Sequence, residues 1–146
     1  MKIVIKNSKI VFAGTKPLEN LIKPQECVNK KYLEIDGTIK EATDARYYVS
    51  NKIPFTDDIS VNTCVWINGT TMSSFATALV FKNSDNSFVR AIQVMKADNQ
   101  AMPQINRVAS SDADTYVILC ARIKDEYTIE DWGAYYGSRI EGKFLY

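Results

Sequence analysis

The fold is decided by two neighbouring runs, Tyr32-Leu33-Glu34-Ile35-Asp36-Gly37-Thr38-Ile39 and, after a polar connection, Arg46-Tyr47-Tyr48-Val49-Ser50-Asn51-Lys52-Ile53-Pro54-Phe55. In the first run, an Asp-Gly pair between short apolar segments is the signal of a tight β-hairpin turn. The second run closes on Ile-Pro-Phe, and a proline, which has no N–H to donate, suits the end or the edge of a strand. We expect a hairpin over residues 32–40 and a strand over residues 46–55.

Four later segments carry strand signals. Residues 59–68 alternate between apolar and polar side chains, which indicates a strand with one covered face. Residues 74–82 are apolar almost throughout, as is typical of a strand buried on both faces. Residues 88–96 follow after a cluster of turn residues and complete a second hairpin. Residues 115–123 give the strongest strand signal of the chain.

Together these segments predict an all-β protein, an antiparallel β-sandwich of jelly-roll type. The chain has 146 residues, which is the usual size of one domain. We therefore expect a single β-sandwich domain over residues 1–146.

The two ends of the chain are expected to add to this domain. Residues 1–13 alternate on either side of Asn7-Ser8 and predict an N-terminal hairpin arm. Residues 125–146 form an aromatic C-terminal extension with a plausible last strand. Within it, Thr128 and Asp131 make a weak N-cap pattern, so residues near them form either a short helix or a loop.

Two connections remain. Residues 14–31 contain Gly14, Pro17 and Pro24 and predict an irregular segment or a brief helical turn. Residues 97–111 carry little pattern and predict a long loop, a kind of segment that is often functional. We expect contacts with other molecules at the N-terminal arm, at this loop and in the C-terminal region, because the opening runs consist of turn and core residues.

Charge and hydropathy exclude two classes of partner. The chain carries 18 basic and 17 acidic residues, a net charge of +1. A protein that binds the phosphate backbone of nucleic acid usually has an excess of positive charge, which this chain lacks. No segment approaches the ~18 consecutive apolar residues of a membrane span, and the N-terminus lacks a signal-peptide pattern. We expect neither nucleic-acid binding nor membrane insertion.

The residues that usually build catalytic or metal sites are scarce. Histidine is absent, which excludes Ser-His-Asp and Cys-His catalysis and histidine-ligated metals. Cys27, Cys64 and Cys120 have no Cys-x-x-Cys spacing and are expected to be free thiols. Asp85, in a polar turn, suits an Asx turn better than a calcium site. The sequence predicts no metal site and no cofactor.

Aromatic residues near polar planar groups give two candidate ligand sites. Sugars stack on aromatic rings and form hydrogen bonds with amides, carboxylates and guanidinium groups. One candidate joins Trp66 to Asn62, on the mixed face of the predicted strand 59–68. The other consists of Trp132, Tyr135, Tyr136 and Arg139. The alternative interpretation for both groups is packing in the core or in a subunit interface, where Trp and Tyr are equally at home.

The order of short motifs resembles a known family. Lys31-Tyr32-Leu33 with Asp36-Gly37, then Tyr47-Tyr48-Val49-Ser50 with Ile53-Pro54, and later Asp112-Ala113-Asp114-Thr115-Tyr116-Val117-Ile118-Leu119 are similar to the motifs of a β-sandwich module of phage tail-fibre and virion proteins. This module recurs especially in phages of gut Bacteroidetes. The resemblance implies a carbohydrate-binding-module-like sandwich and transfers no ligand residue.

The chain departs from that family at two points. The family usually has Pro-Gly or a similar pair after Ile-Pro, whereas this chain has Thr56-Asp57-Asp58. The module is also usually one piece of a long fibre, whereas here it fills the whole sequence. The resemblance therefore implies a stand-alone virion component of the capsid, the neck or a fibre.

We expect a non-catalytic bacteriophage virion protein with a structural or accessory role in assembly or host-surface adhesion, made in the host bacterial cytoplasm and located in the virion. Its expected partners are other virion proteins or further copies of itself in a homo-oligomer. One alternative is a carbohydrate-binding module for host glycans. A second is a small glycan hydrolase, for which the chain offers the carboxylate pairs Asp57/Asp58, Asp112/Asp114 and Glu130/Asp131.

Overall fold

The computed structural model describes residues 11–13, 16–55, 64–67, 72–95, 104–106, 115–136, 139–140 and 143–144, with side chains over 19–55, 77–93 and 115–136. Its strands are β1 (Val11–Ala13), β2 (Lys16–Leu18), β3 (Val28–Asn29), β4 (Lys31–Leu33), β5 (Ile39–Glu41), β6 (Tyr47–Val49), β7 (Ile53–Pro54), β8 (Cys64–Ile67), β9 (Met72–Lys82), β10 (Phe88–Met95), β11 (Gln104–Asn106), β12 (Thr115–Ile123), β13 (Ala134–Tyr136), β14 (Arg139–Ile140) and β15 (Lys143–Phe144). The described residues also form two 3₁₀-helices, η1 (Pro24–Glu26) and η3 (Ile129–Asp131).

All described strand pairings are antiparallel. The predicted all-β class is therefore confirmed, while the jelly-roll connectivity stays a prediction. No helix in the described part of the chain is long and apolar enough to cross a bilayer.

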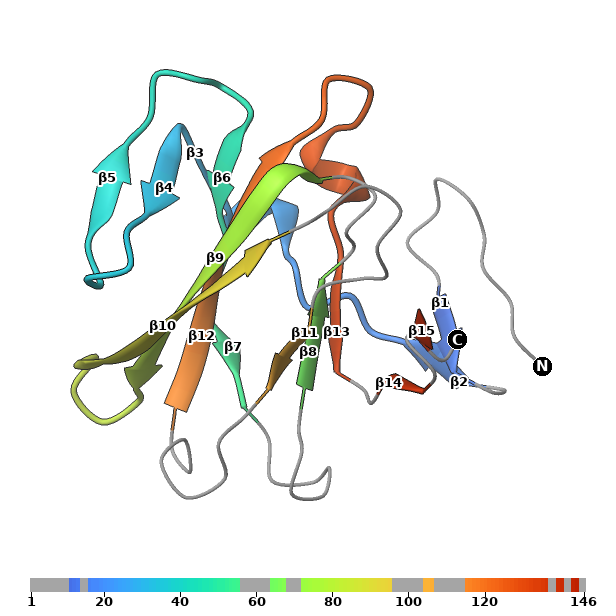
Figure 1. The fold of residues 1–146 in the computed structure, drawn as a ribbon. Helices are drawn as coiled ribbons and strands as arrows, with labels where there is room; N and C mark the ends of the chain where they lie inside the picture. Colours follow the sequence, from blue (N-terminus) through green and yellow to red (C-terminus); the bar gives the residue numbers. More distant parts are fainter. Residues whose placement is uncertain are drawn as a thin grey trace.

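The largest sheet has six strands in the order β10-β9-β12-β6-β3, with β7 also paired to β12. Its centre is β12, which pairs with β9 on one side and with β6 and β7 on the other (Figure 1). The predicted hairpin of residues 74–82 and 88–96 is confirmed as β9 and β10, and the predicted strand 115–123 is β12.

Both faces of this sheet are covered. Side chains alternate along a strand, so β9 and β12 send one set of residues to each face. On one face lies the inner core: Ile22, Ile53, Phe55, Ala78, Val80, Val117, Leu119, Ala121, Ile123, Trp132 and Ala134. On the other lies the outer core: Leu33, Val49, Leu79, Tyr116, Ile118 and Cys120.

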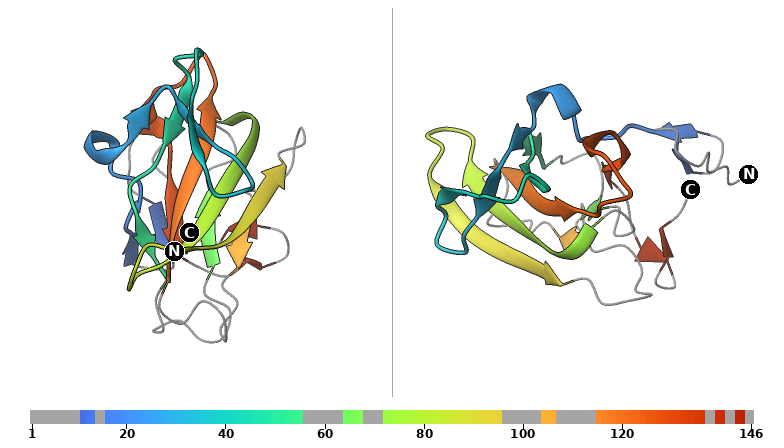
Figure 2. Two further views of the ribbon diagram at one scale, coloured as in Figure 1. Left: turned by 90° about the vertical axis from the view of Figure 1, so that its left-hand side faces the viewer. Right: turned by 90° about the horizontal axis from the view of Figure 1, so that it is seen from above.

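The inner core is closed by a second, smaller sheet of order β11-β8-β13. Trp132, which follows η3, and Ala134, the first residue of β13, are completely buried in the inner core. The outer core is closed by a two-stranded ribbon, β4–β5, which pairs only with itself among the described strands. The ribbon and the small sheet lie on opposite sides of the large sheet (Figures 1 and 2).

The ribbon forms because its sequence suits a hairpin, and it stays in place because its tip and its root contact the sheet. Gly37 has φ +94°, a conformation that L side chains rarely adopt, which confirms the predicted Asp-Gly turn. A Cβ atom on Gly37 would lie 2.8 Å from Cγ of Phe88 on β10. Leu33, at the end of β4 and paired with Ile39, is buried in the outer core. At the root, the Lys30 N–H donates to the Tyr47 carbonyl (2.9 Å).

The predicted strand 46–55 is two strands, β6 and β7, separated by residues 50–52. Ser50 explains the break. Its N–H donates to the Leu119 carbonyl (2.8 Å), and its Oγ accepts the Leu119 N–H (2.9 Å), so one side chain replaces a backbone carbonyl in the ladder. The same hydroxyl donates to the Asn51 carbonyl (2.8 Å).

Other segments depart from the expectation. Val11–Ala13, predicted to belong to an N-terminal hairpin, pair with β2, so the predicted connection 14–31 contains a strand. Residues 1–10 lie outside the described residues. Within the predicted loop 97–111 the structure places β11. The short helix near Thr128 is confirmed as η3, with a capping box between Thr128 and Asp131.

We predict that Thr77→Val raises the free energy of unfolding by ~1 kcal/mol, because the buried Thr77 hydroxyl has no hydrogen-bond partner among the described residues. Urea unfolding measures the change. Ser50→Ala is the matched control: it also removes a buried hydroxyl, but one with partners, and is expected to lower the free energy by ~1–3 kcal/mol. If both variants are less stable than the wild type, the Thr77 hydroxyl does form a hydrogen bond that contributes to stability, and the prediction is wrong.

We also predict that Gly37→Ala lowers the free energy of unfolding by ~1–3 kcal/mol, because an alanine there meets both the positive φ and the Phe88 ring. In a Phe88→Ala background the ring is gone and the backbone strain remains, so the same substitution should cost less. Equal costs in the two backgrounds would show that the ring does not restrain the ribbon.

Candidate functional site

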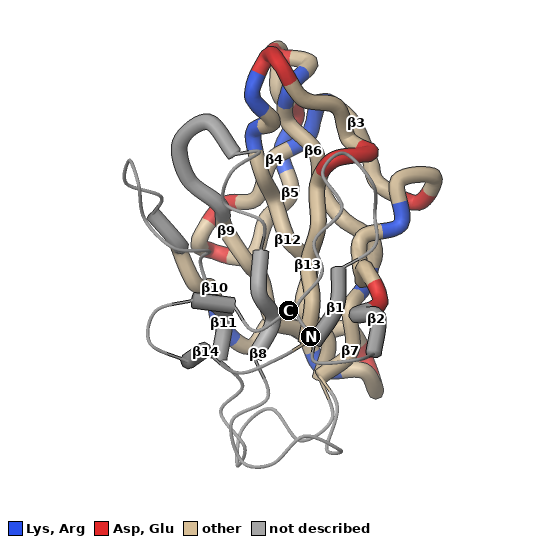
Figure 3. The backbone as a smooth tube through the Cα atoms, turned by 90° about the vertical axis from the view of Figure 1, so that its right-hand side faces the viewer, with Lys and Arg blue, Asp and Glu red and all other residues tan. Residues whose placement is uncertain are grey.

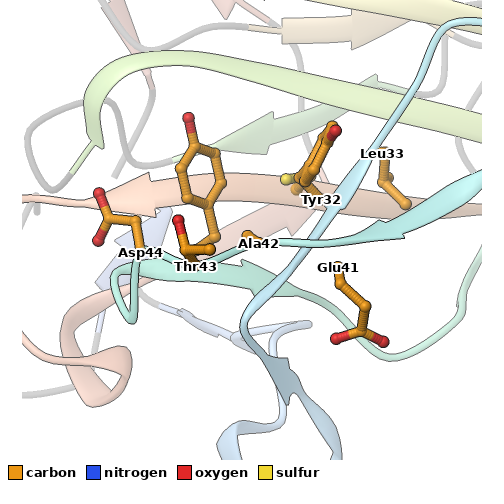
Figure 4. Close-up of a pocket in the computed structure, with 8 residues that line it drawn as sticks. Tyr32, Leu33, Glu41, Ala42, Thr43 and Asp44 are labelled. Carbon is orange, nitrogen blue, oxygen red and sulfur yellow. The ribbon is translucent and has the colours of Figure 1, made fainter.

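A pocket of about 370 Å³ lies where the root of the ribbon meets the large sheet (Figure 4). Its volume falls at the small end of the range for ligand sites, about 300–1,000 Å³. The lining residues come from β4, β5, the connection that follows β5, β6 and β12, and they are Tyr32, Leu33, Glu41, Ala42, Thr43, Asp44, Tyr47 and Cys120. We call this the ribbon pocket.

Backbone contacts fix the connection between β5 and β6, which supplies three lining residues. The Ala42 N–H donates to the Lys30 carbonyl (2.9 Å), and the Lys30 N–H donates to the Tyr47 carbonyl (2.9 Å). Lys30 holds a positive φ of 58° at this crossing. The Asn29 amide adds bonds to the carbonyls of Ala45 (2.7 Å) and Tyr47 (3.0 Å). The ribbon root and β6 are thereby tied together.

Two half-buried tyrosines, Tyr32 of β4 and Tyr47 of β6, form the aromatic part of the pocket. Their ring centroids lie 6.0 Å apart at an interplanar angle of 54°. Two tilted rings present both a flat apolar surface and two phenol hydroxyls, which can donate and accept hydrogen bonds. This combination suits a ligand with an apolar face and a polar edge.

Part of the pocket lining is apolar and uncharged. It consists of Leu33 and Cys120, both buried, and Ala42, and we call these three residues the floor. Burial raises the pKa of the Cys120 thiol to about 11. The group therefore stays protonated at neutral pH and behaves as a small hydrophobic side chain rather than as a nucleophile.

Asp44 is the centre of a charged cluster at one end of the pocket. Its Oδ1 accepts hydrogen bonds from the backbone N–H of Arg46 (2.9 Å) and from Nε of the same residue (3.0 Å). Its Oδ2 accepts hydrogen bonds from Nη2 of Arg46 (2.9 Å) and from Nε of Arg122 (3.0 Å). Arg46 also reaches Asp125 through Nη1 (2.9 Å). A carboxylate has about four acceptor positions, so these bonds occupy the whole capacity of Asp44.

The same contacts settle the protonation of Asp44. Hydrogen bonds from the Arg46 side chain, then from its backbone, and from Arg122 hold the pKa of Asp44 well below its usual range. Glu41, the other acid of the pocket, forms an ion pair with Lys31 (2.6 Å). Figure 4 shows the Glu41 carboxylate directed away from Tyr32 and Asp44. The two acids therefore do not converge on a common point.

The residues singled out from the sequence lie elsewhere. Trp132 and Tyr135 are buried, Trp132 completely, so their described role is the packing that was the alternative interpretation. Tyr136 lines a second hollow of about 260 Å³ beside Pro54. It donates a hydrogen bond to the Pro54 carbonyl, and burial raises its pKa to about 12. The side chains of Trp66, Asn62 and Arg139 lie outside the described residues.

The sequence did not point to the ribbon pocket. Tyr32, Asp44 and Tyr47 belong to the opening stretch, whose residues were interpreted as framework. The signal available was a pair of tyrosines on either side of a polar connection, but their proximity depends on how the ribbon folds over β6 and β12.

Metal ligation finds no support within the described part of the chain, where no group of three or more Asp, Glu, Cys or His side chains gathers. Asp85 accepts the Ser87 N–H (2.9 Å), as expected for an Asx turn. Asp131, from one of the carboxylate pairs, caps η3. The pairs Asp57/Asp58 and Asp112/Asp114 lie outside the described residues.

Comparison with known proteins found no matching family model, no similar curated protein and no similar solved structure. The resemblance to phage virion modules therefore remains a prediction.

We predict that the charge of Asp44 makes the stability of the folded protein decrease as the pH falls below about 4. A carboxylate whose pKa is depressed by folding contributes stability that is complete above its unfolded pKa, about 4, and is lost as the pH falls towards the folded value. Unfolding midpoints of the wild type and Asp44→Asn should therefore differ most at neutral pH and converge below about pH 4.

Asp125→Asn, which removes only the outer contact to Arg46, is the control for this measurement and should give a smaller difference throughout. A gap between wild type and Asp44→Asn that stays constant down to about pH 2 would contradict the role given to the Asp44 charge.

Proposed function

We propose that the chain is a non-catalytic binding module that holds a sugar unit of a cell-surface glycan in the ribbon pocket, and that it serves a phage particle in adhesion. The observation that carries the proposal is the pair of tilted tyrosines, Tyr32 and Tyr47, beside an apolar floor. A sugar ring offers C–H groups on its face and hydroxyls on its edge, which matches aromatic rings with phenol groups at their rim. The Thr43 hydroxyl adds a polar group to this rim.

The electrostatics of the pocket favour binding over hydrolysis. A glycoside hydrolase uses one carboxyl group as an acid, with its pKa raised, and a second as base or nucleophile. Asp44 has the opposite shift, and its acceptor positions are taken by Arg46 and Arg122. Glu41 is paired with Lys31. We therefore assign these acids to holding the pocket in shape.

A second candidate function, assembly with other virion proteins or with further copies, is favoured by apolar residues at the tip of the ribbon and at the neighbouring start of β10. Ile35, Ile39 and Phe88 are 58%, 46% and 40% exposed. Phe88 contacts the turn at Gly37, which lies between the two isoleucines in the sequence. Exposed apolar residues that gather in one place often mark a protein contact.

We predict that Tyr47→Ala weakens binding to immobilised cell-surface glycans at least about tenfold, the equivalent of ~1.4 kcal/mol, while Tyr47→Phe retains most of it. The measurement is surface plasmon resonance on a glycan panel, with thermal unfolding to verify that each variant is folded.

Phe88→Ala is the matched control, because it removes an aromatic ring outside the ribbon pocket. It should leave glycan binding unchanged. If Phe88→Ala instead abolishes an oligomer and no glycan binds the wild type, the assembly function replaces the proposed one.

A further inference from the structure

The charged groups around the ribbon pocket cancel one another. Lys31 is paired with Glu41, and the two guanidinium groups of Arg46 and Arg122 face the carboxylates of Asp44 and Asp125. Over the neighbouring strands β3 to β6, basic and acidic residues are interspersed rather than gathered by sign (Figure 3). The ions at the pocket are thus already engaged with one another, and a charged ligand would have to displace an existing pair.

The floor imposes a second condition. Leu33, Ala42 and Cys120 offer no strong hydrogen-bonding side-chain group, and Leu33 and Cys120 are buried in the outer core. A sugar hydroxyl pressed against this floor would lose its bonds to water without replacement, which is costly. A methyl group in the same place would instead be stabilised by leaving water.

From these two conditions, and resting on the proposed function, we infer that the sugar unit is neutral and carries a methyl group, which lies on the floor formed by Leu33, Ala42 and Cys120. Two kinds of sugar supply such a group: an N-acetylhexosamine, through its acetamido methyl, and a 6-deoxyhexose, through its C6 methyl. The tyrosines stack on the ring, and Thr43 and the phenol hydroxyls contact its polar edge.

The test compares matched sugars on the full chain by NMR titration. N-acetylglucosamine is compared with glucose, L-fucose with L-galactose, and glucuronic acid with glucose. At least one methyl-bearing sugar is expected to bind about fourfold or more tightly than its partner, the equivalent of ~0.8 kcal/mol. Which pair shows the preference identifies the source of the methyl group. Added salt should leave this affinity unchanged, because no net charge is neutralised.

Ala42→Val tests the floor directly, because Ala42 lines the pocket, is only partly buried and is not a residue of the outer core. The methyl preference should disappear, because the side chain of valine occupies the place of the ligand's methyl group. Ala45→Val, a substitution at an exposed alanine of the same connection outside the pocket, should leave the preference intact.

Three results would overturn the inference. If each methyl-bearing sugar binds with the same affinity as its methyl-free partner, the floor does not hold a methyl group. If glucuronic acid binds more tightly than glucose and added salt weakens that binding, the sugar unit is not neutral. Each of these leaves the proposed function standing as long as Tyr47→Ala weakens binding. Absence of binding by every sugar and glycan would remove the proposed function together with the inference.

Discussion

The structure depends on one constraint: β9 and β12 are apolar on both faces, so the sheet that they centre must be covered twice. Apolar burial is the dominant favourable term in folding, and neither strand could face water on one side. The small sheet with Trp132 covers one face. On the other face the cover is a narrow ribbon anchored by Leu33. Because two strands span less than the sheet beneath them, the ribbon leaves an opening at its root, and this opening is the ribbon pocket.

Within the pocket, charge and aromatic surface have separate tasks. Asp44 spends its acceptor capacity on Arg46 and Arg122, which joins the connection after β5 to β12. Such partly exposed pairs contribute modestly to stability, but they fix direction because the bonds to Arg46 form a planar fork. The tyrosines remain as the groups that a ligand can contact. This division supports the proposed binding role, because the pKa of Asp44 is held well below its usual range and its carboxylate oxygens already accept hydrogen bonds from Arg46 and Arg122.

Much of the fold could be predicted from short-range signals. Asp36-Gly37 marked the ribbon turn, and the continuous apolar run of residues 74–82 marked a strand covered on both faces. The prediction failed where a tertiary contact decided the outcome. Ser50 divides the strand 46–55 because its hydroxyl bonds to Leu119, a residue that nothing in the local sequence indicates. The sequence could not decide whether Trp132 binds a ligand or packs in the core, because an indole ring is covered in either role. The pocket was missed because Tyr32, Tyr47 and Cys120 meet only through folding of the ribbon onto β6 and β12.

The central claim is that a sugar binds at the ribbon root, and the most direct test is the map of amide chemical-shift changes when the ¹⁵N-labelled chain is titrated with a binding glycan. The account predicts changes that cluster at residues 31–33 and 41–47 and on β12 around Cys120, with the inner core unaffected. Changes confined to β13 and the hollow beside Tyr136, or an absence of change at Tyr32 and Tyr47 while the glycan binds, would contradict it.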